Sequence, residues 1–469
     1  MVFSSPLFLF LFLPLVLAVD AVAPQALRNA FLLLASLAFY AWGEHELVLL
    51  LVASILLNWG LGLAVARLER PGLRRLALTA AVLLNIGALV YFKYTSFLAA
   101  NLDALLLRLH RPPLALAPVH LPIGISFVTF EALSYVIDVY RREVPAQRDP
   151  IRVGLYISVF PHLVAGPILR YGDLAAALAH RPRDGRRFAS GVERFILGFA
   201  KKILIANTVG AVADRVFALP AGELGLGAAW LGAVTYALQI YFDFSGYSDM
   251  AIGLGRLVGF ELVENFDYPY TATSIQDFWR RWHISLSRWF RDYLYIPLGG
   301  NRHGPLRTGL HLVLVFLLCG LWHGASWNFV LWGLYHGTFL VLERTGWGRL
   351  LERAPTGLRR LYALLVVMVG WVPFRAATLD TTLHFLKGLC GLGNPSGDVA
   401  HAASLIGTEE RLALLLGLVG AAPVWRRLGR HLTETRASSS AAAVHVALFL
   451  LALSYMATST YNPFIYFRF

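Results

Sequence analysis

Uncharged apolar stretches long enough to cross a lipid bilayer recur along the whole chain. The stretch 47–66 contains no Asp, Glu, Lys or Arg, and the same holds for 76–92, 153–169, 224–242 and 308–342. The hydrocarbon core of a bilayer, about 30 Å thick, is crossed by about 20 apolar residues in a helix. Only 15% of the residues are charged, against about 25% in a soluble domain. We therefore predict an all-α polytopic membrane protein in which about eleven helices span the bilayer, and we treat residues 1–469 as a single domain.

The charged residues outside these stretches predict an orientation. The chain has 41 Lys and Arg against 28 Asp and Glu, a formal net charge of +13. Too few residues lie outside the membrane to form a basic nucleic-acid-binding domain, so we expect no nucleic-acid partner and assign the cations to loops that face anionic lipid. The loops 67–75, 181–187 and 426–430 are basic, and the turn 44–46 is acidic. By the positive-inside rule the basic loops are cytoplasmic and both chain termini are extracytoplasmic, which requires an odd number of spans.

Four features are not expected in this chain: a cleaved signal peptide, a disulfide framework, a metal site and a covalent cysteine relay. No basic residue precedes Leu7, which makes a cleaved signal peptide the weaker interpretation of the first apolar stretch. Cys319 and Cys390 lie in apolar surroundings and argue against a disulfide framework or a thiolate metal cluster. The His-x-x-x-His or Cys-x-x-Cys spacing of a metal site is absent near Cys319, so we expect no metal. A buried thiol is usually a small hydrophobe, so a covalent relay through Cys319 is not favoured.

Two carboxylates directly follow an apolar stretch. Asp243 and Asp249 lie in the sequence Tyr-Phe-Asp-Phe-Ser-Gly-Tyr-Ser-Asp-Met at 241–250. Ionisable residues at membrane depth are costly, so each is by default a functional hypothesis. Backbone that is broken at Gly246 and buried in protein, as in a re-entrant element lining a cavity, would explain both carboxylates. A helix end followed by an interfacial loop is the alternative.

An amphipathic helix is predicted over 276–293. An apolar stripe at helical spacing opposes a face that carries Asp and Arg side chains. The stripe consists of Trp279, Trp282, Leu286, Trp289 and Tyr293, and the polar face of Asp277, Arg281, Arg288 and Asp292. The pattern predicts a helix at the membrane interface, with indoles as anchors and most arginines toward lipid headgroups. The alternative is that a few arginines bind phosphates of a ligand. His283 borders the stripe, and its functional and structural interpretations both stay open.

The longest uncharged run carries three histidines, and two of them, His323 and His336, are each followed by a glycine. His323 lies between Gly320 and Gly324, which we expect to leave room for a substrate beside the ring. A neutral imidazole with room beside it is a natural general base near neutral pH. On one straight helix His336 would point about 220° away from His323, so the two could share a site only if the helix breaks, for which Gly333 offers a place. We therefore predict that His323 is catalytic and that His336 is structural.

Several long motifs point to a known family. They are Tyr-Phe-Asp-Phe-Ser-Gly-Tyr-Ser-Asp-Met at 241–250, Phe-Trp-Arg-Arg-Trp-His-Ile-Ser-Leu-Ser at 278–287, Leu-Gly-Gly-Asn-Arg at 298–302 and Gly-Leu-Trp-His-Gly-Ala at 320–325. Supporting motifs are Leu-Pro-Ile-Gly-Ile-Ser-Phe at 121–127, Phe-Pro-His-Leu-Val-Ala-Gly-Pro at 160–167 and Gly-Trp-Val-Pro-Phe-Arg-Ala at 370–376. In these motifs the chain resembles the membrane-bound O-acyltransferase family over essentially its whole length.

This resemblance implies a fold, an activity and a site. Family members form a ring of helices around a funnel, in which a cytoplasmic acyl donor meets an acceptor from the other side. The family's invariant membrane histidine falls on His323, and its second functional histidine falls on His283. The implied activity is acetyl transfer in the bacterial inner membrane, from acetyl-CoA or another acyl thioester to periplasmic acetyltransferase proteins that esterify an alginate-like exopolysaccharide. No bound cofactor is implied.

Supporting roles and alternatives follow from the same resemblance. His283, or in second place Asn328 or Ser326, would orient the His323 ring or stabilise the oxyanion, and Asp243 and Asp249 are further supporting candidates. The group that would hold donor phosphates is Arg280, Arg281 and Arg288. The shared motifs do not exclude related acceptors, because sister branches acetylate peptidoglycan or cellulose or attach D-alanine to teichoic acid. Two alternatives belong to a different class of protein. One is a transporter or flippase, which would also need buried charges along a cavity, and the other is a purely structural membrane subunit.

Overall fold

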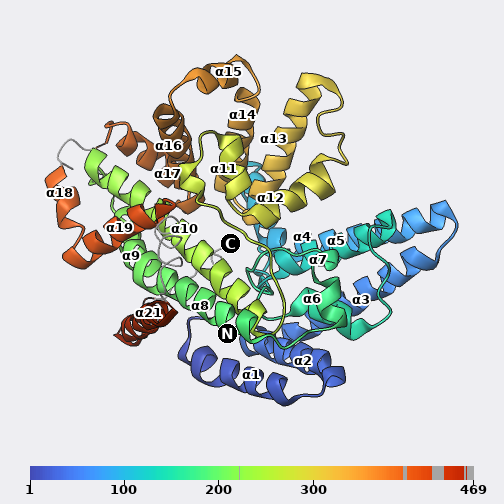
Figure 1. Cartoon of the computed structure of the whole chain (residues 1–469). Helices are drawn as coiled ribbons and strands as arrows, with labels where there is room; N and C mark the ends of the chain where they lie inside the picture. The colour runs from blue at the N-terminus through green and yellow to red at the C-terminus, as the bar shows by residue number, and fades with distance from the viewer. Residues whose placement is uncertain (221, 394–398, 425–437, 459–460, 462–469) are drawn as a thin grey trace. The chain divides into compact units, whose positions relative to one another are not determined.

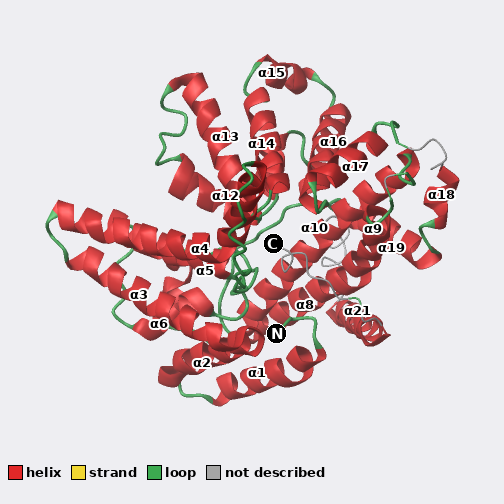
Figure 2. Ribbon diagram, turned by 180° about the vertical axis from the view of Figure 1, so that it is seen from behind, coloured by secondary structure: helices red, strands yellow, loops and turns green. Residues whose placement is uncertain are grey.

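Helices provide all the regular secondary structure of the described chain. The structure is a computed structural model that describes every residue except 221, 394–398, 425–437, 459–460 and 462–469 (Figure 1). No strand occurs among the described residues, which form helices and loops (Figure 2). The prediction of an all-α protein is therefore confirmed. The basic loop 426–430 and the C-terminal end, both used above to predict orientation, lie outside the described residues.

The chain divides into two compact units. The first unit comprises Met1–Arg194 and Ala251–Val263, and the second unit comprises Phe195–Met250 and Glu264–Phe469. The interpretation of residues 1–469 as a single domain stays a prediction.

The first unit contains the N-terminal helices. Their bounds are η1 Phe8–Phe12, α1 Leu13–Val22, α2 Gln25–Glu44, η2 His45–Leu47, α3 Val48–Arg67, α4 Pro71–Arg108, α5 Ile125–Arg141, α6 Pro150–Ser158, α7 Tyr171–Ala179 and the first part of α8 Gly185–Ala200. Helix α3 packs against α4, α5 and α6. Gly124 precedes α5 with a left-handed backbone, and a Cβ there would lie 2.6 Å from the carbonyl oxygen of Leu163. Only glycine fits this entry into α5.

The second unit contains both predicted histidines, His283 between α11 and α12 and His323 at the end of α13. The bounds of its helices are η3 Lys201–Ala206, α9 Asn207–Phe217, α10 Leu226–Leu257, η4 Pro269–Thr271, α11 Ile275–Arg281, α12 Ile284–Phe290, η5 Arg291–Tyr295, α13 Gly304–His323, α14 Trp327–Leu342, α15 Gly346–Arg353, α16 Thr356–Arg375, α17 Leu379–Leu389, α18 Val399–Ser404, α19 Thr408–Gly420 and α21 Ser438–Thr458. The last seven residues of α10 belong to the first unit. Helices α13 and α14 pack along each other, and α16 packs against α14.

Five helical stretches of the described chain are long and apolar enough to cross a membrane. They are Gln25–Arg67, Pro71–Arg108, Gly185–Phe217, Gly304–His323 and Thr356–Arg375. Large apolar side chains on these stretches are exposed, as in Leu83 of α4, which is 67% exposed. Such a surface is unfavourable in water and suits lipid. The chain is therefore a multi-pass membrane protein, whereas the number of eleven spans and the central funnel stay predictions.

Candidate active site

The segment around His283 forms two short helices instead of one long amphipathic helix. Helix α11 ends at Arg281, α12 begins at Ile284, and His283 between them has a left-handed backbone with φ 43°. Asn265 explains the break, because its side-chain oxygen accepts hydrogen bonds from the backbone N–H of Ser285 at 3.2 Å and from its hydroxyl at 2.9 Å. The backbone carbonyl of Asn265 also accepts from the N–H of Ile284 at 3.0 Å. The prediction of a single helix over 276–293 is wrong.

The indole rings of this segment lie inside the protein. Trp279, Trp282 and Trp289 are all buried. The Trp282 ring packs against Trp371 of α16, with ring centroids 4.9 Å apart, and against Phe266 at 5.0 Å. Because the chain changes direction at His283, the apolar stripe becomes part of the core. The interpretation of these indoles as interfacial lipid anchors is therefore wrong.

His283 is fully buried at the junction of α11 and α12. Its Nδ1 lies 3.2 Å from Oδ1 of Asn265, an oxygen that already accepts two bonds from Ser285, so Nδ1 carries the proton and donates. Burial lowers the pKa of His283 to about 3, which keeps the ring neutral near neutral pH. In a neutral ring with its proton on Nδ1, Nε2 is the acceptor atom. This tautomer does not suit His283 for donating a hydrogen bond to an oxyanion through Nε2.

His323 is the last residue of α13 and is also buried. The rings of Trp322, Trp332 and Phe374 surround it, with centroids at 5.0, 5.1 and 5.2 Å. The Trp322 ring contacts both predicted histidines, since its centroid is also 6.2 Å from that of His283. The structure therefore brings His283 and His323 to one aromatic ring.

The chain turns back directly after His323. Gly324 has an extended backbone, and α14 begins at Trp327 and continues through Gly333. A break that lets the two histidines approach each other does occur, but it lies at Gly324 and not at Gly333, the place considered above. As a result, His323 and His336 both contact the ring of Trp332, at centroid distances of 5.1 and 5.0 Å. His336 is fully buried among aromatic rings, and its structural role stays a prediction.

The two glycines beside His323 do not leave room for a substrate. A Cβ at Gly320 would lie 2.2 Å from the carbonyl oxygen of Phe329, and a Cβ at Gly324 would lie 2.1 Å from Cε2 of the Phe329 ring. The space beside each glycine is thus filled by α14. The absence of a Cβ allows α13 and α14 to approach closely, as small residues do between membrane helices. The expectation of open space beside the imidazole is wrong.

Asn328 and Ser326 lie at the start of α14. The side-chain amide of Asn328 donates to the carbonyl of Ala376 at 2.6 Å, and its oxygen accepts from the hydroxyl of Thr382 at 3.4 Å. These bonds tie α14 to the chain that follows α16. Ser326 is the N-cap residue of α14, but its hydroxyl makes no capping hydrogen bond. The Asn328 amide is thus engaged in holding helices together, and the supporting roles of both residues stay predictions.

Asp243 and Asp249 are buried in an unbroken helix. Helix α10 runs through Gly246 without interruption and continues to Leu257, so both alternatives, a re-entrant break at this glycine and a helix end followed by an interfacial loop, are wrong. Asp243 pairs with Lys202 at 2.6 Å, and Asp249 pairs with Lys201 at 2.6 Å. A Cβ at Gly246 would lie 2.8 Å from a backbone carbonyl oxygen of α8. Gly246 therefore permits a close helix crossing, and the two carboxylates are neutralised by lysines of η3.

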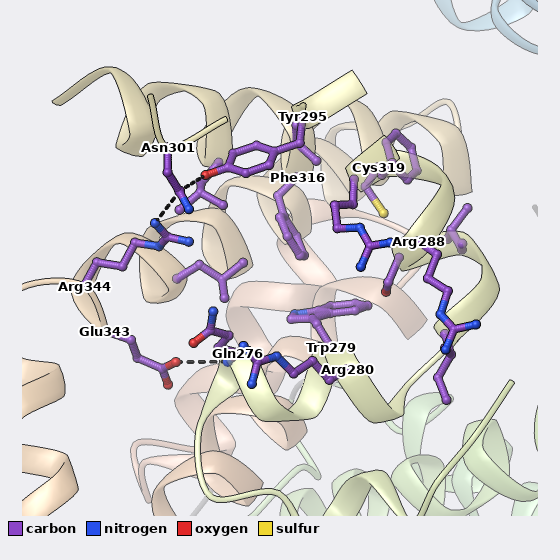
Figure 3. A pocket seen from close by; sticks show the side chains of 18 residues that line it. Gln276, Trp279, Arg280, Arg288, Tyr295, Asn301, Phe316, Cys319, Glu343 and Arg344 are labelled. Atoms are coloured by element: carbon purple, nitrogen blue, oxygen red, sulfur yellow. Dashed lines mark hydrogen bonds between the residues drawn. The ribbon is translucent and has the colours of Figure 1, made fainter. Parts of the chain in front are cut away.

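A cavity lined by arginines lies among α11, α12, η5 and the hairpin of α13 and α14 (Figure 3). Its volume is about 590 Å³, and we refer to it as the arginine cavity. Arg280, Arg288, Arg291 and Arg344 line it. Arg291 pairs with Asp292 at 2.6 Å, and Arg344 donates to the side-chain oxygen of Asn301 at 2.9 Å. Arg280 and Arg288 are exposed and make no hydrogen bond or ion pair to any described residue.

The third predicted arginine does not belong to this cavity. Arg281 pairs with Asp277 at 2.9 Å and with Asp267 at 3.6 Å. The i, i+4 spacing of Asp277 and Arg281 already favours this pair on one helix face. The sequence pattern did not predict Arg344 as a cavity residue, because Arg344 follows α14 and lies far along the chain from the motif that contains Arg280.

The arginine cavity extends to the helix that carries His323. Cys319 lines the cavity and precedes His323 by one turn of α13. Glu343 lines the opposite part, where its carboxylate accepts backbone N–H groups of Ile275 at 2.6 Å and Gln276 at 2.9 Å. Burial raises the pKa of Glu343. Both cysteines are free thiols, and the described residues contain no group of three His, Cys, Asp or Glu side chains that could hold a metal ion.

Comparison with known proteins identifies the family. Residues 125–374 match the sequence model of MBOAT, the membrane-bound O-acyltransferase family. The chain is 45% identical to the probable alginate O-acetylase AlgI of Azotobacter vinelandii, over 89% of this chain and 83% of that protein. It is 40% identical to the probable alginate O-acetylase AlgI of Pseudomonas putida over 100% of both chains. It is also 37% identical to the peptidoglycan O-acetyltransferase of Helicobacter pylori, over 84% of this chain and 81% of that protein.

The helical fold and these matches define the class of protein. The chain belongs to the membrane-bound O-acyltransferase family, and it is an O-acyltransferase.

Proposed function

We propose that the protein transfers an acetyl group from a cytoplasmic thioester donor for the O-acetylation of an extracytoplasmic polysaccharide, and that this acceptor is an alginate-like exopolysaccharide. The observation that carries the proposal is the arginine cavity, whose lining extends from Arg280 and Arg288 to Cys319, one turn before His323. The names of the relatives at 45% and 40% identity support acetyl as the group and alginate as the acceptor.

Acetyl-CoA, or another acyl thioester with phosphates, fits the arginine cavity as donor substrate. The guanidinium groups of Arg280 and Arg288 have no partner among the described residues, and a planar guanidinium can bind a phosphate through two hydrogen bonds. Trp279 and Phe316 add aromatic faces to the same lining, on which a nucleotide base can stack. The donor is consumed as a substrate, so the proposal needs no bound cofactor.

The chemistry requires one base and correct alignment. An acyl thioester is already activated, so the enzyme has to align the donor with the acceptor hydroxyl and remove the hydroxyl proton. In our proposal Nε2 or Nδ1 of His323 takes this proton while the hydroxyl oxygen bonds to the thioester carbonyl carbon. The carbon–sulfur bond then breaks, and the leaving thiolate takes the proton from His323. The acceptor hydroxyl belongs to the polysaccharide or to a periplasmic acetyltransferase partner protein that passes the acetyl group on.

His283 serves as a positioning residue in this proposal. Its Nδ1–H is held by Asn265 at 3.2 Å, which fixes the ring and leaves Nε2 as the acceptor. The Trp322 ring between His283 and His323, with centroid distances of 6.2 and 5.0 Å, keeps the two imidazoles in a constant relation.

We further propose that the protein lies in the bacterial inner membrane with its N-terminus and C-terminus outside the cytoplasm. Contacts within the first unit support this orientation. The connection between α1 and α2 would be cytoplasmic by counting one span from an external N-terminus, and the basic segment 181–187, a loop that runs into α8, would be cytoplasmic by its charge. Arg181 of this loop pairs at 3.1 Å with Asp20 in the last turn of α1, as expected if the two segments share one side of the membrane.

The replacement His323→Ala tests the proposed function. It should leave protein amount and membrane insertion unchanged and lower acetyl ester in the polymer by at least about 100-fold, as expected for loss of a general base. His384→Ala is the matched control, because His384 is an exposed histidine of α17. Full acetylation in the His323 variant would refute the proposed base.

Product analysis distinguishes the alternatives. Acetyl ester found on peptidoglycan or on cellulose would mean that the acceptor differs from the proposed one while the reaction is the same. Peptidoglycan is the second candidate acceptor because of the name of the Helicobacter pylori relative. D-alanyl ester on teichoic acid would change both the acyl group and the acceptor. Movement of a substrate across vesicles without any acyl donor, with His323 dispensable, would favour a transporter or flippase. Full acetylation after replacement of every buried histidine would favour a structural subunit.

A further inference from the structure

The first unit contains a basic cavity that the proposed acyl transfer does not use. Its volume is about 250 Å³, and its lining includes Arg28, Arg183, Arg187 and Arg256. All the lining residues belong to the first unit. We refer to it as the basic cavity.

One buried carboxylate in the basic cavity serves two buried arginines. Asp20 pairs with Arg28 through Oδ2, and its Oδ1 lies 3.1 Å from Nη2 of Arg181. The side chains of Arg28 and Arg181 are only 4% and 1% exposed. Burial lowers the pKa of Arg181 to about 10, so this group keeps its charge at neutral pH. A single carboxylate compensates one of the two guanidinium charges, and a buried uncompensated charge is costly.

Two further arginines add positive charge without a carboxylate partner. Arg183 donates to the backbone carbonyls of Asp20 at 3.2 Å and Ala23 at 2.9 Å. Arg187 donates to the backbone carbonyl of Gly259 at 3.5 Å. A carbonyl group satisfies a donor but carries no net charge, so both guanidinium charges remain uncompensated by these bonds.

The remaining charges of the basic cavity do not remove the surplus. Arg256 is matched by Glu261 at 2.7 Å. Asp184 accepts backbone N–H groups at the start of α8, at 2.9 and 3.3 Å. In and beside the cavity, five guanidinium groups therefore face three carboxylates, which leaves two positive charges in excess. An anion from outside the chain would balance part of this excess.

The basic cavity lies where apolar helices end. Helix α1 ends at Val22, α2 begins at Gln25 and α8 begins at Gly185, and all three belong to the apolar helical stretches of the chain. The ends of membrane-spanning helices lie at the level of the lipid headgroups. Leu17 and Phe188 contribute apolar side chains to the same lining, and Phe188 is 42% exposed. A ligand at this level would meet guanidinium groups with one end and apolar side chains with the other.

We propose that the basic cavity is a binding site for the phosphate group of an anionic phospholipid. The phosphodiester supplies the missing negative charge and accepts charge-assisted hydrogen bonds from Arg187 and Arg183, and the acyl chains lie along Leu17 and Phe188. This proposal does not depend on acyl transfer, because the site shares no residue with the arginine cavity.

Lipid binding to the purified full-length protein in a zwitterionic detergent tests the proposal. The probes are phosphatidylglycerol, which is anionic, phosphatidylcholine, which has the same phosphate but no net charge, and inorganic phosphate. Arg187→Gln removes one cavity guanidinium. Arg186→Gln is the matched control, since Arg186 is the exposed neighbour in the same first turn of α8 and does not line the cavity. Native mass spectrometry counts bound lipids, and size-exclusion chromatography checks that each variant is folded.

We expect one phosphatidylglycerol per protein, bound about tenfold more tightly than phosphatidylcholine, and a loss of about tenfold in Arg187→Gln, as for one charge-assisted hydrogen bond. Arg186→Gln should bind like the unaltered protein, and Arg187→Lys should recover part of the affinity. Equal binding of the two lipids, or equal loss in both glutamine variants, would overturn the proposal. If inorganic phosphate displaces the lipid and its binding depends on Arg187 in the same way, the ligand is not a lipid and the cavity is a site for free phosphate. If Arg187→Gln misfolds, the lipid preference of the unaltered protein decides.

Discussion

Replacing Gly320 with alanine tests whether the glycines beside His323 serve helix packing or substrate access. A Cβ at this position would lie 2.2 Å from the carbonyl oxygen of Phe329 and 3.2 Å from the Cα of Gly333. A carbon and a carbonyl oxygen in favourable contact are about 3.3–3.6 Å apart, so α14 would have to move by about 1 Å at this crossing. Both contacts are with backbone atoms, which cannot rotate away as a flexible side chain can.

The displacement sets the expected size of the effect. Overpacking of this kind costs typically about 1–3 kcal/mol, and a rigid backbone contact belongs at the upper end. We therefore expect Gly320→Ala to lower the free energy of unfolding by about 3 kcal/mol. The same shift moves His323, which lies one turn further along α13, relative to Trp332 of α14, so we expect kcat to fall together with stability.

The measurement pairs unfolding in mixed detergent micelles with the acetyl-transfer assay. Gly60→Ala on α3 is the control, since a Cβ at Gly60 would meet nothing within 4 Å; the change from glycine to alanine in a helix should there be neutral or stabilising by up to about 1 kcal/mol. If Gly320→Ala kept the stability of the unaltered protein and changed only the KM for the acceptor, the glycine would border substrate space and the packing explanation would be wrong.

Three further predictions address charge. Arg288→Gln should raise the KM for the acyl donor about tenfold or more with kcat unchanged, because a charge-assisted hydrogen bond is worth about 1.5–3 kcal/mol. Arg302 is an exposed arginine outside the arginine cavity, so Arg302→Gln should leave this KM unchanged. Equal effects of the two replacements would exclude a specific phosphate contact at Arg288. The side chain of Lys202 is only 2% exposed, so Lys202→Met leaves the charge of its ion-pair partner Asp243 uncompensated and should lower the free energy of unfolding by about 3–5 kcal/mol. The side chain of Lys201 is 33% exposed, so Lys201→Met should lower it by at most about 1 kcal/mol. Similar losses for the two variants in micellar unfolding would contradict this difference in burial. Because the pKa of His283 is about 3 in the folded protein and about 6.5 in an unfolded chain, the unfolded chain binds more protons between these values. Stability should therefore fall as the pH drops below about 6.5, by about 2 kcal/mol at pH 5, and His283→Gln should remove this component of the pH dependence of Tm.

Sequence patterns predicted the features that depend on neighbours along the chain. Apolar windows indicate helices because a buried backbone in lipid must satisfy its own hydrogen bonds, and the described residues are indeed helical. Polar residues within apolar surroundings are conspicuous for the same reason, and two of them, His283 and His323, contact the ring of Trp322 in the structure. The i, i+4 pair of Asp277 and Arg281 was equally accessible to sequence reasoning.

The wrong predictions concern contacts between distant parts of the chain. The break between α11 and α12 depends on Asn265, which lies 18 residues before His283 and has no place in a helical periodicity. Gly246 and Gly333 were each considered as places where the backbone could break, yet both helices continue. A Cβ at Gly333 would lie 2.4 Å from the carbonyl oxygen of Phe316. A glycine that breaks a helix and a glycine that packs two helices look the same in a sequence, because each only lacks a Cβ.

The packing interpretation of these glycines also accounts for the rigidity that the site requires. Lipid tails are as apolar as leucine side chains, so the hydrophobic effect contributes little to the association of helices within a membrane. Helices held by close backbone contact gain instead from the many van der Waals contacts that the absence of a Cβ permits. Between α13 and α14 such contacts occur at Gly320 and at Gly333, on either side of the turn that follows His323. The imidazole is therefore positioned by a hairpin that is held by close backbone contacts, whereas the exposed side chains of Arg280 and Arg288 in the arginine cavity can adapt to a donor.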